Sequence, residues 1–112
     1  MPSTTVYQPG DLILVTFPHT SGGKAASRPA LVLLDTGDAD VLLARVTTQR
    51  HTSPYDLSIA DWHGAGLLAA SFIRLHKLAS IEKSLVRRLL GILQPADRAR
   101  VSTLLKQMFG NW

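Results

Sequence analysis

Short apolar runs, each bounded by glycine, proline or polar residues, dominate the first part of the chain. Residues 11–17 read DLILVTF and residues 29–34 read PALVLL. Both runs are continuous in apolar residues and too short for helices, which is typical of strands buried on both faces. A turn over residues 35–40 then leads into residues 41–49, VLLARVTTQ, where valine and threonine favour a further strand.

Alternation of apolar and polar residues marks two later segments. Residues 56–61, DLSIAD, alternate cleanly, and so do residues 71–78, SFIRLHKL. In the second segment one predicted face carries Ser71, Ile73 and Leu75, and the other carries Phe72, Arg74 and His76. The alternation therefore predicts that Arg74 and His76 lie side by side on one face of a strand.

The last third of the chain changes from strand to helix. Residues 85–93, LVRRLLGIL, suit a strand or a helix, and Gly91 with the Val-Arg-Arg centre favours a strand. Pro95 suits the first turn of a helix, and Gly110 suits its end. Its apolar stripe would consist of Val101, Leu104, Leu105 and Met108. Many short strands followed by one helix predict a mainly β fold, a small and strongly bent sheet or barrel.

Composition narrows the picture. The chain has 112 residues, which predicts one domain over residues 1–112. It has no cysteine, so disulfides, thiolate zinc sites and a cysteine nucleophile are excluded, and a reducing cytoplasm is expected. No apolar run approaches the length of a membrane span, so no membrane association is expected. The net charge is +4, and arginine outnumbers lysine, which favours a polyanionic partner such as nucleic acid.

Candidate chemistry first appears in the loop at residues 18–27, PHTSGGKAAS, which leads directly into Arg28. His19 and Lys24 either contact phosphate or are simply the solvated residues of a long hairpin loop. Arg28 stands at the start of a strand, where we expect its guanidinium to bind phosphate. The GGK sequence lacks the spacing and the following helix of a phosphate-binding P-loop.

No metal or cofactor is expected. Asp35, Asp38 and Asp40 resemble the opening of a calcium-binding loop. Val46, however, stands at the position of the bidentate glutamate that such a loop requires. The four histidines form neither a close pair nor a helical i, i+4 pair, so no zinc site is predicted.

Several of these segments together resemble the PemK/MazF-type toxins of bacterial toxin-antitoxin pairs. The resemblance is carried by GDLILVTFP, SRPALVLLD, RVTTQ, SFIRLHKL and LLGILQPADRARV, in that order, over residues 10–108. It implies a small SH3-like barrel of the PemK/MazF/CcdB type with a C-terminal helix. It also implies a cytoplasmic homodimer that cleaves single-stranded RNA, including mRNA, at a specific short sequence and without a metal ion. A small antitoxin would neutralise it, and the complex of the two would bind DNA.

The resemblance also implies roles for particular residues. The reaction is attack of a ribose 2'-hydroxyl on the neighbouring phosphate, which needs a base, an acid and fixed cations. Arg28 would be the cation, and Thr47 would match the family's catalytic threonine, unless a bulge exchanges it with Thr48. Arg74 would be catalytic together with His76, which stands where one branch of the family has aspartate. The remaining predicted RNA contacts are His19, Lys24, Arg45, Gln49 and Arg50.

An alternative keeps the fold but makes the protein a non-catalytic binder. It would then act like the gyrase-poisoning relatives of the same architecture or like an RNA-binding barrel. In the gyrase-poison form the apolar-aromatic C-terminal tail, MFGNW, would enter the partner.

Overall fold

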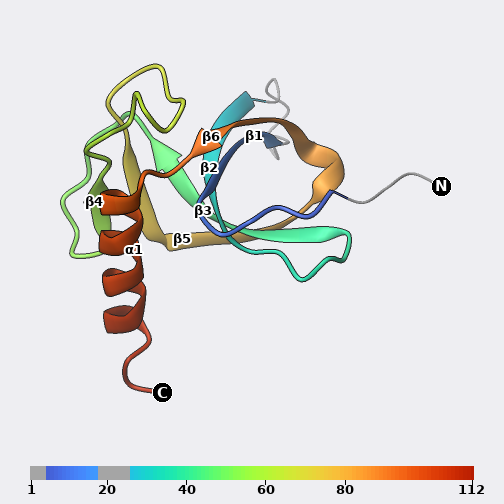
Figure 1. The fold of residues 1–112 in the computed structure, drawn as a ribbon. Coiled ribbons are helices and arrows are strands. Elements are labelled where there is room, and N and C mark those ends of the chain that lie inside the picture. The colour runs from blue at the N-terminus through green and yellow to red at the C-terminus, as the bar shows by residue number, and fades with distance from the viewer. Residues whose placement is uncertain (1–4, 18–25) are drawn as a thin grey trace.

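A computed structural model describes residues 5–17 and 26–112 and contains one bent antiparallel sheet with a helix beside it (Figure 1). The strands occur in the order β4-β5-β3-β2-β1-β6 across the sheet. The elements are β1 (Asp11–Phe17), β2 (Ala26–Leu34), β3 (Asp40–Thr47), β4 (Asp56–Ser58), β5 (Phe72–Glu82), the 3-10 turn η1 (Lys83–Leu85), β6 (Val86–Ile92) and α1 (Pro95–Met108). The predicted mainly β fold with a C-terminal helix is confirmed.

Two strand boundaries differ from the sequence pattern for a physical reason. The alternation over residues 56–61 predicts a longer strand than β4, which ends at Ser58. The backbone N–H groups of Ala60 and Asp61 instead donate to the carboxylate of Asp97 at 3.0 and 2.9 Å. A buried side chain in α1 therefore takes the donors that would have continued the strand. On the other side, β5 runs on to Glu82 because it also pairs with the first half of β3.

The sheet curves strongly, and α1 stands outside the curve beside β4 and β5 (Figure 1). Register shifts interrupt the pairing of β1 with β6, β2 with β3 and β3 with β5, and such irregularities bend a sheet. Within the described part of the chain no backbone pairing joins the edge strands β4 and β6, so the barrel is not closed by hydrogen bonds. The segment before β5 covers β6 instead, where a Cβ at Gly91 would collide with the carbonyl group of Ala65.

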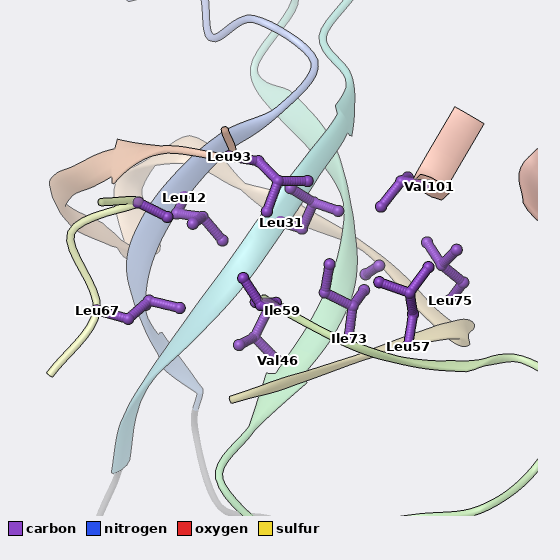
Figure 2. Packing of buried hydrophobic residues seen from close by; sticks show 12 residues of the cluster. Leu12, Leu31, Val46, Leu57, Ile59, Leu67, Ile73, Leu75, Leu93 and Val101 are labelled. Carbon is purple, nitrogen blue, oxygen red and sulfur yellow. The ribbon is translucent and has the colours of Figure 1, made fainter. Parts of the chain in front are cut away.

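Two apolar clusters lie on the two faces of the sheet. The outer cluster packs the sheet against α1, and Figure 2 shows its side chains converging from strands, from the segment before β5 and from the helix. It includes Leu12, Leu31, Val46, Ile73, Leu75, Leu93 and Val101. The inner cluster consists of Ile13, Val15, Ala30, Val32, Val41 and Leu43. Because β1 and β2 contribute to both clusters, the prediction that their apolar runs are buried on two faces is confirmed.

Candidate functional site

The inner face of the sheet, the one that carries the inner cluster, becomes polar toward β4. Opposed residues of antiparallel strands project to the same face. One row across the sheet pairs Asp56 with Arg74, Arg74 with Arg45, and Arg45 with Ala30 of the inner cluster. The inner face therefore holds two arginines and a carboxylate in line with the apolar core.

The other predicted site residues of the described strands fall on the same face. Thr47 lies two residues beyond Arg45 on β3, and Arg28 is opposite Val15 of the inner cluster. His76 lies two residues beyond Arg74 on β5, and the one residue between them, Leu75, belongs to the outer cluster. The fold thus brings Arg28, Arg45, Thr47, Arg74 and His76 to one face of the sheet. Periodicity predicts the shared face within a strand, and the strand pairing joins the three strands.

Arg74 is the centre of the polar contacts on this face. Its Nε donates to Oδ1 of Asp56 at 2.8 Å, and its Nη2 lies 3.5 Å from Nε2 of His76. The side chains of Arg74 and Asp56 are 15% and 2% exposed. The predicted proximity of Arg74 and His76 is confirmed. The carboxylate that pairs with Arg74 comes from β4, and the sequence pattern did not link it to Arg74.

Asp56 is a functional candidate that sequence reasoning missed. Burial alone would raise its pKa, but hydrogen bonds from the Ser53 hydroxyl, from Arg74 and from the Ser53 backbone N–H lower the pKa to about 2. Asp56 is therefore ionised near neutral pH and acts as a fixed negative charge rather than as a proton donor. The local signal was present as a serine three residues before an aspartate, but the pairing of β4 with β5 is long-range and no local pattern predicts it.

His76 is held between Arg74 and an aromatic ring. Its ring centroid lies 5.4 Å from that of Tyr55, and its Nδ1 is buried without a hydrogen-bond partner among the described residues. A guanidinium only donates hydrogen bonds, so the tautomer that suits this contact is the neutral ring with its proton on Nδ1 and its lone pair on Nε2. The register between β3 and β5 shifts at His76, which lies between the paired Arg74 and Leu78. Such bulges re-aim side chains beside functional sites.

The other two arginines of the inner face, Arg28 and Arg45, are exposed. Neither guanidinium has a hydrogen-bond partner among residues 5–17 and 26–112, so both are available to an anion. Thr47 is the last residue of β3, and its hydroxyl oxygen accepts a hydrogen bond from the backbone N–H of Gln49 at 3.1 Å. The hydroxyl proton of Thr47 can therefore still be donated, and Thr48 is exposed after the strand has ended.

Of the predicted RNA contacts beyond β3, Arg50 lines a small polar hollow. A pocket of about 280 Å³ lies beside the inner face and is lined by Arg50, His51, Thr52, Ser53, Asp56, Ser58 and Phe72. Phe72 is opposite Thr47, so the hollow adjoins the end of β3. Gln49 lies past the strand and is exposed. His19 and Lys24 lie outside the described residues.

The described residues contain neither a cluster of metal ligands nor a membrane-spanning helix. No three histidine, aspartate or glutamate side chains gather closely enough there to hold a metal ion. No helix there is both long and apolar enough to cross a bilayer.

Comparison with known proteins places the whole arrangement in a family. Residues 8–109 match the family described as the PemK-like, MazF-like toxin of type II toxin-antitoxin systems. No significant match was found among curated protein sequences.

Solved structures share the fold at low sequence identity. MazE-MazF from Deinococcus radiodurans superposes with a TM-score of 0.76 at 20% identity, covering 95% of this chain and 98% of that one. An endoribonuclease from Mycobacterial species gives 0.74 at 19% identity, with 96% and 94% covered. An endoribonuclease in complex with its cognate antitoxin, also from Mycobacterial species, gives 0.70 at 21% identity, with 90% and 92% covered. At these identities the likeness establishes the fold.

Proposed function

Because this chain belongs to the family of PemK-like, MazF-like toxins of type II toxin-antitoxin systems, we propose that it is a toxin that cuts single-stranded RNA, including mRNA, without a metal ion. The observation that carries the proposal is the shared inner face of Arg28, Arg45, Thr47, Arg74 and His76. Three guanidiniums, a hydroxyl and an imidazole on one face are the groups that phosphoryl transfer at an RNA backbone requires.

The proposed reaction uses a nucleophile that the RNA itself carries. The 2'-oxygen of a ribose bonds to the adjacent phosphorus while the bond from that phosphorus to the 5'-oxygen breaks. A base takes the proton of the 2'-hydroxyl, and an acid gives a proton to the leaving 5'-oxygen. The products are a 2',3'-cyclic phosphate and a 5'-hydroxyl. The nucleophile needs no metal-bound water, and the arginines supply the positive charge.

Arg28 is assigned to the phosphate oxygens, whose negative charge increases as the transition state forms. Its guanidinium stays protonated and offers a planar fork of donors, which suits a phosphate better than a proton-transfer role. Its exposure on the inner face supports this assignment. Removing one such preorganised donor from an active site lowers kcat by about 100- to 1,000-fold.

Proton transfer is assigned to His76 and hydrogen bonding to Thr47. Nε2 of His76 carries the lone pair in the neutral tautomer and faces Arg74. A phosphate that binds the Nη donors of Arg74 would free this lone pair and bring the neighbouring ribose to it, so that Nε2 can accept the 2'-hydroxyl proton. The Thr47 hydroxyl keeps its proton free to donate to a phosphate oxygen, while Arg45 and Arg50 extend the cationic track on either side.

The proposed partners follow from the family. We assign to the chain a second copy of itself as a homodimer, and a small antitoxin as its inhibitor, with a DNA-binding role for the complex. An acidic antitoxin segment would compete with RNA for the same exposed arginines. The existence of a similar fold in an endoribonuclease bound to its cognate antitoxin supports this assignment.

The alternative, a non-catalytic binder, rests on the C-terminal tail. Phe109 is half exposed and Trp112 fully exposed, so both rings are accessible to a partner. If the tail carries the activity, deleting residues 109–112 abolishes toxicity while purified protein leaves RNA intact.

The test uses a short single-stranded RNA with a label at each end, purified protein and excess EDTA. The proposal predicts cutting under these conditions, and no cutting when the 2'-hydroxyl at the cleaved position is replaced by hydrogen. Arg28→Ala should abolish cutting with the fold intact by circular dichroism. Arg88→Ala is the matched control, because Arg88 is opposite Leu14, whose side chain is on the outer face, and is also exposed. Intact RNA with the native protein refutes the proposal.

A further inference from the structure

Asp56 is a buried carboxylate with no chemical step of its own in the proposed reaction. It begins the edge strand β4, and its side chain is 2% exposed. A buried charge needs a partner, and Asp56 has three donors: Arg74 Nε at 2.8 Å, the Ser53 hydroxyl at 2.6 Å and the Ser53 N–H at 3.0 Å. Two of these donors belong to Ser53, three residues away, and the third belongs to Arg74, a candidate catalytic residue.

The row across the sheet explains why Arg74 needs this partner. Arg74 is opposite Arg45 on one side, and like charges that face each other across strands repel. Asp56 is opposite Arg74 on the other side and supplies the opposite charge. Asp56 thus offsets the repulsion between Arg74 and Arg45 and fixes Arg74 on the face that holds the other polar residues.

The carboxylate is itself oriented before it meets Arg74. Both bonds from Ser53 go to Oδ2, which leaves Oδ1 for Arg74. The Ser53 hydroxyl oxygen in turn accepts the backbone N–H of Tyr55 at 3.2 Å, so the turn before β4 fixes it. The contacts form a chain from Ser53 through Asp56 and Arg74 to His76.

Only one nitrogen of the Arg74 guanidinium is used by Asp56. The bond to Nε fixes the plane of the group and leaves both Nη groups, of which Nη2 faces His76. A guanidinium held in this way can offer its Nη donors to a phosphate without first having to be ordered.

Resting on the function proposed above, we infer that Asp56 is a positioning residue that acts through Arg74: it holds the guanidinium by Nε so that the Nη donors and Nε2 of His76 address the same phosphodiester. Asp56 does not touch the RNA. Ser53 serves the same end by aligning the carboxylate.

The experiment is a double-mutant cycle on RNA cleavage. Asp56→Asn keeps the size of the side chain and removes its charge, and it should lower kcat by about 10- to 100-fold with KM changed less than about threefold. In an Arg74→Ala background, Asp56→Asn should change kcat by less than about twofold, because the residue through which it acts is gone. Ser53→Ala, which keeps the backbone N–H, should give a smaller loss of the same kind.

Asp35→Asn is the matched control. Asp35 is a fully buried carboxylate paired with Lys83 at 2.9 Å, and it lies just past the opposite end of β2 from Arg28. This variant perturbs a comparable ion pair away from the site, so its kcat should stay within about twofold of the native value. An equal loss of kcat in Asp35→Asn would show that burial of any charge, rather than positioning, controls the rate.

A second measurement reads the position of Arg74 without RNA. The Nε–H of Arg74 should give a slowly exchanging resonance in a ¹H–¹⁵N spectrum, lost in Asp56→Asn and kept in Asp35→Asn. Equal losses of kcat from Asp56→Asn with and without Arg74, or an unchanged resonance in Asp56→Asn, overturn the inference. If the native protein leaves RNA intact, the proposed function fails, and the resonance alone then decides whether Asp56 positions Arg74.

Discussion

The stability of the protein should fall in acid through Asp56, and the size of the effect follows from its contacts. Burial alone would raise the pKa of this carboxyl, but Ser53 and Arg74 lower it from 3.8 to about 2. A group whose pKa is lower in the folded state contributes stability above its unfolded pKa and loses it as the pH falls through the folded pKa. The loss therefore belongs to the window from about pH 4 to pH 2.

The full difference between the two pKa values corresponds to about 2.4 kcal/mol. Ser53 is only three residues from Asp56, so its hydrogen bonds also form part of the time in the unfolded chain, which reduces the contribution to about 1–2 kcal/mol. Asp35 and Asp97 also have lowered pKa values, because hydrogen bonds from backbone N–H groups and from Lys83 and Arg100 outweigh their burial. Their protonation adds to the loss of stability as the pH falls.

The assay is urea unfolding at several pH values between 2 and 6, followed by circular dichroism, for the native protein and Asp56→Asn. The variant should be less stable near neutral pH, and its free energy of unfolding should vary less across the window, by about 1–2 kcal/mol. Parallel curves for the two proteins would refute the assigned role of the Asp56 charge in the fold.

Three further outcomes are expected. His76→Ala should lower the single-turnover rate more than it weakens binding to a 2'-deoxy RNA analogue, since His76 is assigned to proton transfer; an unchanged rate removes it from the mechanism. Asp97→Ala should lower Tm by about 8 °C, or about 2 kcal/mol, because two backbone donors lose their acceptor; calorimetry measures this, and a shift under about 2 °C contradicts it. Gly91→Ala should destabilise the fold by about 1–3 kcal/mol in urea, because its Cβ meets the carbonyl group of Ala65; native stability would show that the packing there is loose.

The strands that carry local signals were predictable. Residues 11–17 coincide with β1. A short continuous apolar run that follows a glycine predicts a strand buried on both faces. Alternation placed Arg74 and His76 together, and the structure confirms it. Over residues 85–93 the pattern favoured a strand over a helix, and β6 (Val86–Ile92) confirms the strand. The close approach of Gly91 to Ala65 explains why a glycine stands there.

The contacts that the sequence did not reveal are all between distant segments. Asp97 fits a helix N-terminus by pattern, but its role in ending β4 depends on a backbone more than thirty residues away. Asp56 reads as one polar position in an alternating strand, and only the pairing of β4 with β5 brings it to Arg74. Periodicity assigns faces within a strand, whereas the neighbour of a strand is set by the whole sheet.

The most direct test of the central claim compares the native protein with Arg28→Ala on one labelled single-stranded RNA in excess EDTA. The account predicts discrete cuts with 2',3'-cyclic phosphate ends from the native protein and from Arg88→Ala. It predicts a rate lower by at least about 100-fold from a folded Arg28→Ala. Native-like cutting by Arg28→Ala, or intact RNA with the native protein, would contradict it.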